Sequence, residues 1–97
     1  MTIEGFSDKE KDIAIQLVEI AAQETGNWIT GYKVFSDEEV KISLESYPGK
    51  LERFLEYLSK SGISFNKSKV ADEVKKIISG DDIPEEIKVD FLLRIRC

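Results

Sequence analysis

The last stretch of the chain, Ile87 to Arg96, constrains the fold more than any other, because apolar and polar residues alternate along it. Its apolar residues recur at every second position: Ile87, Val89, Phe91, Leu93 and Ile95. A period of two places these side chains on one face of a β-strand. Leu92 breaks the alternation, which indicates partial cover on the second face. The pattern predicts a strand over 87–96 that the rest of the chain covers.

A helix is the alternative for this stretch. Pro84, Glu85 and Glu86 suit a first helical turn, because proline loses no hydrogen bond there and acids favour the positive end of the helix dipole. At about 100° per residue, however, the apolar side chains would spread around the whole helix. The strand therefore fits the pattern better.

The length and the amino-acid composition are typical of one soluble globular domain over residues 1–97. The chain is 41% hydrophobic and 34% charged. It has no apolar run near the roughly 20 residues that span a bilayer, and no basic patch before an apolar stretch as in a signal peptide. The single cysteine, Cys97, cannot form an internal disulfide. We expect a cytoplasmic location and no membrane association.

The residue types exclude much catalytic chemistry. The chain has no histidine, which removes the commonest general base, Ser-His and Cys-His nucleophiles, and most zinc sites. Acids cluster at 37–39 and 81–86, but neither cluster has the ligand spacing of a calcium loop. The glycines are isolated and build no phosphate-binding loop. We expect a non-enzymatic protein without catalytic residues, cofactor or metal.

Charge is unevenly distributed along the acidic chain, whose net charge is −5. Residues 1–49 carry 10 acids and 4 bases, whereas residues 50–97 carry 9 acids and 10 bases. Proteins that bind nucleic acid usually show a strong basic surface. The acidic balance therefore disfavours a nucleic-acid partner, although the second half could present a local basic face.

Three segments are predicted to be helices. The first runs from about residue 7 to 25, with Ser7 and Glu10 as a capping box. It has a wide apolar arc, formed by Ile13, Leu17 and Ile20 at helical spacing with Ala14, Val18, Ala21 and Ala22 beside them. The second runs over about 50–61, and the third from 67 or 69 to 79, with Ser68 or Asn66 as its cap.

A β-hairpin is predicted between the first two helices. Residues 27–35 are rich in aromatic and β-branched types, and residues 40–47 alternate. The polar segment 36–39 between them is a turn, although it also matches a capping box. We favour the hairpin because Ile42 fits only the alternation. Gly31, inside the first strand, is typical of a bulge or a close backbone approach.

The register of this hairpin decides where its aromatic side chains point, because a slip of one residue turns a strand over. A five-residue loop pairs Tyr32 with Ile42 and places Trp28, Tyr32 and Val34 on the core face. A four-residue loop exposes an aromatic stripe that would be a protein-binding surface: Trp28, Tyr32 and Tyr47. We favour the five-residue loop and keep the stripe as the candidate site.

The predicted element order is α-β-β-α-α-β, an α+β two-layer sandwich with a three-stranded sheet and helices on one face. The last strand, being the most apolar, lies inside the sheet or forms an edge that pairs with another copy. A long connection through two helices reaches it, so its direction stays open.

This order resembles that of the type II KH domain, an RNA-binding fold. The family's G-x-x-G loop lies between two consecutive helices, where this chain has Ser59 to Phe65 with Gly62 as its single glycine. The resemblance implies phosphate contacts near this turn, which Lys60, Lys67 and Lys69 flank. A solvated helix face is the simpler interpretation of these lysines.

Two functional hypotheses follow. The first is a non-enzymatic protein-interaction domain (an adaptor, subunit or inhibitor) that uses a sheet face, a sheet edge or an acidic surface. Its partner is a protein of unknown identity, and a homodimer could form through the last strand. The alternative is a nucleic-acid-binding domain of KH-like shape that contacts phosphates through Lys60, Lys67 and Lys69.

Overall fold

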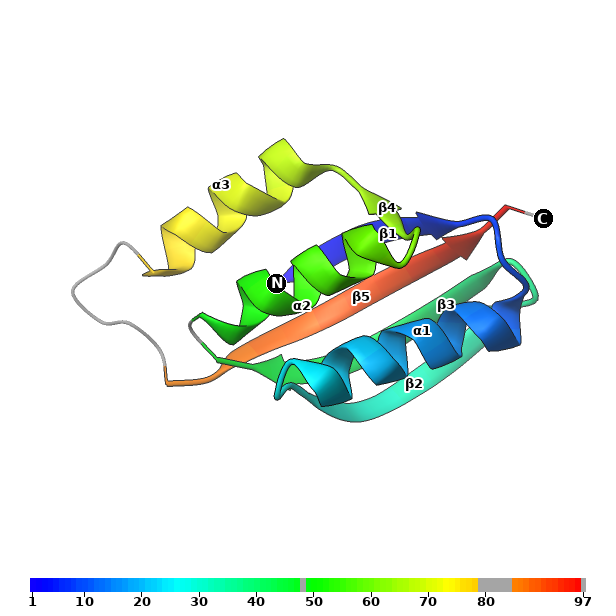
Figure 1. Cartoon of the computed structure of the whole chain (residues 1–97), viewed down its shortest axis with the longest axis horizontal. Coiled ribbons are helices and arrows are strands. Elements are labelled where there is room, and N and C mark those ends of the chain that lie inside the picture. The colour runs from blue at the N-terminus through cyan, green and yellow to red at the C-terminus, as the bar shows by residue number, and fades with distance from the viewer. Residues whose placement is uncertain (48, 79–84, 97) are drawn as a thin grey trace.

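A computed structural model describes residues 1–47, 49–78 and 85–96 (Figure 1). The elements, in chain order, are β1 (Thr2–Ser7), α1 (Lys11–Glu24), β2 (Trp28–Ser36), β3 (Glu39–Ser46), α2 (Lys50–Lys60), β4 (Ser64–Phe65), α3 (Lys67–Ile78) and β5 (Ile87–Ile95). Of the residues named in the sequence predictions, the acids at 81 and 82, Pro84 and Cys97 fall outside the described residues.

The described strands form one mixed sheet in the order β2-β3-β5-β1-β4. β1 and β5 run parallel, and every other neighbouring pair is antiparallel. Helices α1 and α2 cover one face of the sheet, and α3 lies on the side where β1 and β4 end the sheet (Figure 1). The α+β prediction is confirmed. The three-stranded sheet and the KH-like order are wrong in detail, because β1 and β4 add two strands.

β5 is the central strand, and its alternation is the pattern that the sequence predicted. Its five alternating apolar residues are buried and Leu92 is half-buried. Phe91 pairs with Ile3 of β1 on one side and with Ile42 of β3 on the other. The helix alternative for this stretch is therefore wrong. With both edges occupied, β5 offers no free edge, which corrects the expectation that it could pair with another copy.

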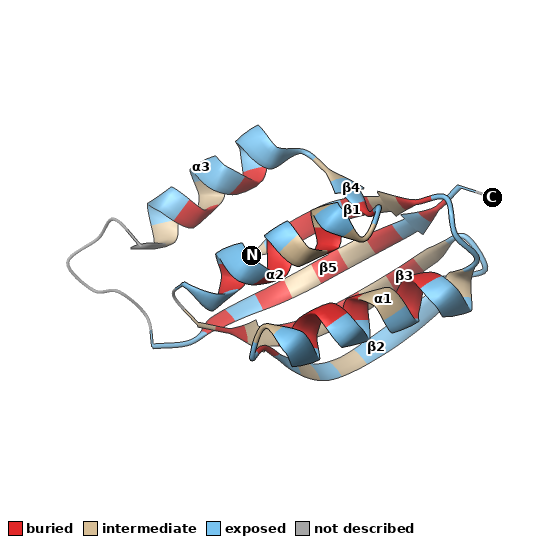
Figure 2. Cartoon of the chain, viewed as in Figure 1, coloured by how far each residue is buried: buried red, intermediate tan, exposed pale blue. Residues whose placement is uncertain are grey.

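The core lies between the sheet and the helices (Figure 2). Phe91 packs edge-to-face on Phe54 of α2, with ring centroids 6.4 Å apart and an interplanar angle of 79°. The Phe91 ring fills the space above Gly5 of β1, where an added Cβ would lie 2.8 Å from Cε1 of Phe91 and closer still to Cζ. Gly5 is therefore required for this close approach, although its backbone lies outside the left-handed region.

The first helix begins later than predicted and buries only part of its predicted apolar arc. Ser7 is the last residue of β1, and its Oγ accepts a hydrogen bond from the Lys9 N–H at 3.1 Å, so the capping box is wrong. The buried residues of α1 are mostly small: Ala14, Ile15, Val18, Ala21 and Ala22. Ile13 and Ile20 remain 46% and 45% exposed.

In α3, Asn66, one of the two caps predicted for this helix, accepts a hydrogen bond from the Lys69 N–H at 3.1 Å.

A buried polar cluster joins the end of α1 to β3 and α2. The amide of Asn27 donates to Thr25 Oγ1 at 2.7 Å and to the Lys50 carbonyl at 3.2 Å. The fully buried Ser46 hydroxyl donates to Asn27 Oδ1. Asn27 therefore fixes the corner from which β2 leaves.

Substitution Asn27→Ala is expected to cost about 2 kcal/mol of stability, because it leaves the buried Ser46 hydroxyl without this acceptor. Urea denaturation measures the cost. Thr30→Ala is the control, since the Thr30 hydroxyl bonds the Ser43 carbonyl at an exposed position. The double variant Asn27→Ala/Ser46→Ala should recover part of the loss. Equal costs for Asn27→Ala and Thr30→Ala would contradict this account of the corner.

Candidate protein-binding edge

β2 ends the sheet, so one side of its backbone has no neighbouring strand among the described residues. Four consecutive residues, Gly31 to Val34, pair regularly with β3, and register shifts interrupt the pairing on either side of this run. The strand exposes four large apolar side chains: Trp28 (68% exposed), Tyr32 (61%), Val34 (44%) and Phe35 (50%). We call these four residues the β2 edge patch.

The pairing confirms the favoured register, since Tyr32 lies opposite Ile42 and Val34 opposite Val40. The five-residue loop itself is wrong, because Ser36 also pairs with Glu39 and only Asp37 and Glu38 lie between the strands. One register shift lies between Ile29 and Gly31, so the bulge expected near Gly31 is confirmed. An extra residue in one strand reverses the alternation beyond it. Trp28 therefore lies opposite Glu45, on the face without helices, and its predicted place on the core face is wrong.

Tyr32 and Val34 show that facing the core side is not the same as burial. Their direct partners on β3 are fully buried, yet both side chains remain exposed. β2 lies outside β3 in the sheet, so its helix-side residues have a neighbouring strand on one side only. The favoured register therefore predicts correctly that Tyr32 and Val34 point to the helix side of the sheet. Because they stay exposed there, they form an apolar surface rather than part of the core.

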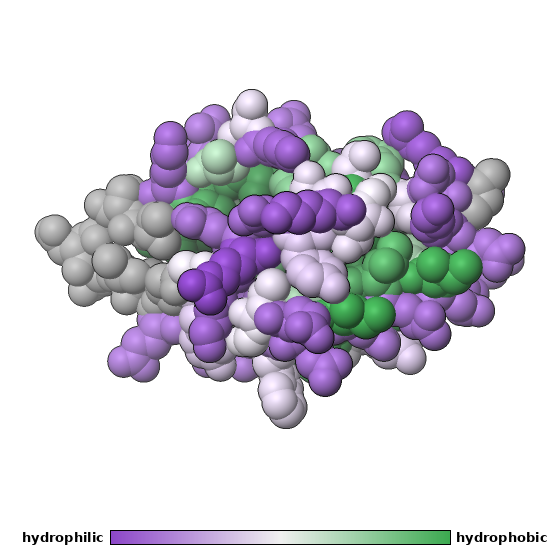
Figure 3. Space-filling model, viewed as in Figure 1, coloured by the Kyte–Doolittle hydropathy of each residue, from purple (hydrophilic) through white to green (hydrophobic). Residues whose placement is uncertain are grey.

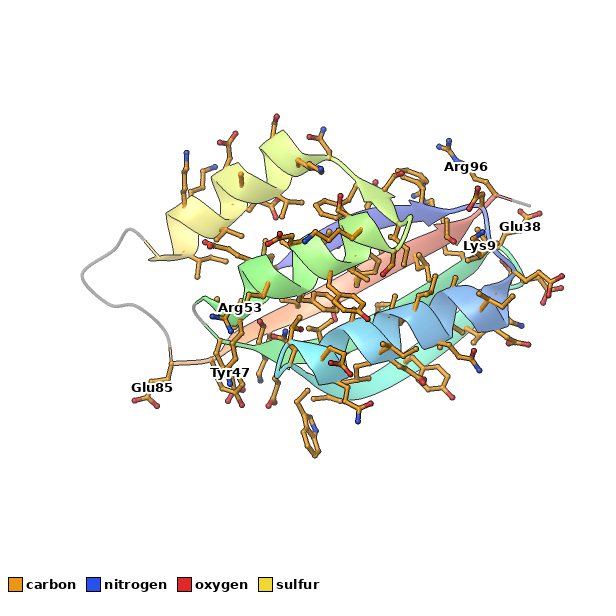
Figure 4. All side chains as sticks on the ribbon, viewed as in Figure 1. Lys9, Glu38, Tyr47, Arg53, Glu85 and Arg96 are labelled. Carbon is orange, nitrogen blue, oxygen red and sulfur yellow. The ribbon has the colours of Figure 1, made fainter. Side chains whose placement is uncertain are left out.

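Tyr47 is not part of this surface. It follows β3, is half-buried, and lies at the end of the molecule where α2 begins (Figure 4). The Lys50 Nζ lies 5.1 Å from the centroid of its ring, a cation–π contact. Trp28 and Tyr32 project from opposite faces of β2. The predicted stripe of Trp28, Tyr32 and Tyr47 is therefore corrected to the β2 edge patch.

The lysines of the nucleic-acid hypothesis are divided between two grooves. Lys60 and Lys67 line a groove of about 550 Å³ between α2 and α3, which we call the α2–α3 groove. Lys69 lines a separate groove of about 690 Å³ between β1 and α3. Lys60 also forms an ion pair with Glu56, with 3.1 Å between Nζ and Oε1. The three lysines therefore do not line one groove.

The face without helices carries mixed charge. Arg94 lies 3.8 Å from the Glu4 carboxylate, and the Ser43 hydroxyl donates to Asp90 at 3.0 Å. The described residues contain no group of three or more potential metal-ligating side chains. Within residues 1–47, 49–78 and 85–96, no helix is long and apolar enough to cross a membrane.

Trp28 reports directly on the bulge, because it is the only tryptophan. We expect the fluorescence emission maximum of the folded protein to lie close to that of the urea-unfolded chain, with efficient quenching by acrylamide. Both follow from the high exposure of the side chain. A blue-shifted emission that acrylamide does not reach would place Trp28 in the core instead.

No protein-family model, no curated protein and no solved structure matches the chain. The candidate site therefore rests on the geometry of the β2 edge patch.

Proposed function

We propose that the chain is a non-enzymatic protein-interaction domain that binds an extended segment of a partner protein along the free edge of β2. One observation carries the proposal: an unpaired strand edge coincides with four exposed large apolar side chains. Added strands bind by backbone hydrogen bonds, while alternate side chains provide specificity.

Proteins that keep their edges unpaired usually protect them with charge, bulges or short strands. β2 has two register shifts and one central charge, Lys33. These features are confined to its ends and to one side chain. The regular run Gly31 to Val34 stays open, and Tyr32 and Val34 flank it with apolar surface. Aromatic residues are enriched among those that dominate binding energy, which suits Trp28 and Tyr32 as anchors.

The test compares three forms of the tagged domain in pull-downs from source-cell lysate, with and without nuclease. The edge variant, Val34→Lys/Phe35→Lys, adds two charges to exposed positions of β2. The control variant, Thr2→Lys/Ser68→Lys, adds the same charge at exposed positions on β1 and α3. Circular dichroism should show that all three remain folded.

The expected result is a protein partner that survives nuclease, binds wild type and control equally, and is lost at least about tenfold with the edge variant. Equal recovery by all three forms would contradict the proposal. Co-purifying nucleic acid, with proteins lost after nuclease, would favour the alternative through Lys60, Lys67 and Lys69 instead.

A further inference from the structure

A second apolar surface lies on α1, the helix that contacts β2. Ile13, Leu17 and Ile20 are spaced by four and three residues and share one side of the helix. Ile13 and Ile20 are exposed and Leu17 is half-buried. Hydrophobic surface over α1 is visible on the side of the molecule that the helices occupy (Figure 3). We call these three residues the α1 stripe.

The α2–α3 groove is the apolar hollow in the same helix layer. Its apolar lining comes from both helices and β4: Leu55, Phe65, Val70, Ala71 and Val74. Hydrophobic surface also shows between the positions of α2 and α3 in the view of Figure 3. Its volume of about 550 Å³ lies within the size range of ligand-binding pockets.

Charge makes the stripe and the groove complementary. α1 carries three acids and one lysine, and that lysine, Lys11, lies 3.2 Å from the carboxylate of Asp37. Glu10 and Glu24 bound the α1 stripe at its two ends. α3 carries four lysines and two acids, and Lys67 and Lys75 line the groove. On its α2 side the groove is lined by Glu52 and by the Glu56–Lys60 ion pair, so the basic part of its rim is the α3 side. An acidic helix with an apolar side thus meets an apolar groove whose α3 side is basic.

The length of α1 is also similar to the lengths of α2 and α3, the two helices that form the groove. α1 has 14 residues, and α2 and α3 have 11 and 12. At about 1.5 Å per residue these helices are about 21, 16 and 18 Å long. An amphipathic helix that lays its apolar side in a groove between two helices is a common recognition mode.

We propose that two copies of this chain associate through their helix layers, with the α1 stripe of each copy in the α2–α3 groove of the other. Both surfaces open on the same side of the molecule, so a two-fold axis along α2 satisfies both contacts at once. The four residues of the β2 edge patch belong to neither the α1 stripe nor the groove lining.

The first measurement is sedimentation of the wild-type chain over a concentration series. The expected mass at tens of micromolar is twice 11.0 kDa. A monomer throughout this range would overturn the proposal.

Two variants then locate the contact. Ile20→Glu charges the α1 stripe, and Ala71→Glu charges the groove; both positions are exposed, so the fold should persist. Each variant alone should be monomeric, with its dissociation constant raised about tenfold or more. The matched controls, Gln23→Glu on α1 and Ser68→Glu on α3, add the same charge outside the two surfaces and should associate like wild type.

Mixing the two variants is the decisive step. A dimer of Ile20→Glu with Ala71→Glu keeps one intact stripe and one intact groove that face each other. The mixture should therefore contain a heterodimer that neither variant forms with itself. Variants that dimerise like wild type, or a mixture that stays monomeric, would overturn the proposed contact.

Discussion

Replacing Phe91 with alanine is expected to cost about 3–5 kcal/mol of folding stability, the largest effect of any single substitution considered. The ring is fully buried at the centre of the sheet, between Ile3 and Ile42. Its removal deprives Phe54 of its edge-to-face partner and leaves a cavity above Gly5. Domains of this size are stable by about 5–15 kcal/mol, so the variant should be close to unfolding.

Urea denaturation followed by circular dichroism measures this cost. The matched control is Phe35→Ala, because Phe35 is half exposed on the edge strand. It should change stability by no more than about 0.5 kcal/mol. Similar costs for Phe91→Ala and Phe35→Ala would show that Phe91 is not the centre of the core.

Gly5→Ala is expected to destabilise the fold by about 3 kcal/mol, because the new methyl group overlaps the Phe91 ring. A glycine-to-alanine change that causes no strain normally stabilises a protein by about 0.4–1 kcal/mol through the unfolded state. The opposite sign at Gly5 would therefore come from packing alone. Neighbouring side chains hold the ring, so it cannot move aside freely.

Gly31→Ala is the matched control, because an added Cβ there meets nothing within 4 Å and the residue also lies in a strand. It should be neutral or slightly stabilising. Combining Gly5→Ala with Phe91→Leu should cost less than the sum of the single changes, since the shorter side chain makes room. Additive costs in this double variant would contradict the contact between residues 5 and 91.

The same contact explains why the first strand could not be predicted. A buried strand is recognised by apolar residues at every second position. The inward positions of β1 are Ile3, Gly5 and Ser7, of which only Ile3 is large and apolar. Phe91 supplies from another strand the volume that Gly5 lacks. The apolar pattern was therefore complete in β5 and absent in β1, so of these two neighbouring strands only β5 was predicted.

Helical periodicity was ambiguous on α1 for a related reason. The chain offers one apolar stripe of large residues, Ile13, Leu17 and Ile20, and another of small ones around Ala14 and Ala21. Small side chains allow a helix to lie close to the sheet, and α1 buries the small stripe. Spacing alone does not distinguish the stripe that packs from the stripe that stays exposed.

The candidate site was predicted in part. The concentration of aromatic residues over 28–35 indicated the segment that forms the exposed edge strand, and the pairing of Tyr32 with Ile42 is correct. The edge position of β2 depends on the strand order, which includes the two strands that were not predicted. The direction of Trp28 depends on a single extra residue near Gly31, whose exact place no pattern in the sequence specifies.

Hydrogen exchange of the domain, alone and with its captured partner, tests the central claim most directly. Strand addition pairs the outward amides of β2, so exchange over Trp28–Ser36 should slow on binding, while the short β4 strand at the opposite edge stays unchanged. Protection confined to β2 is the predicted result. A bound partner that leaves exchange over β2 unchanged would contradict the proposed function.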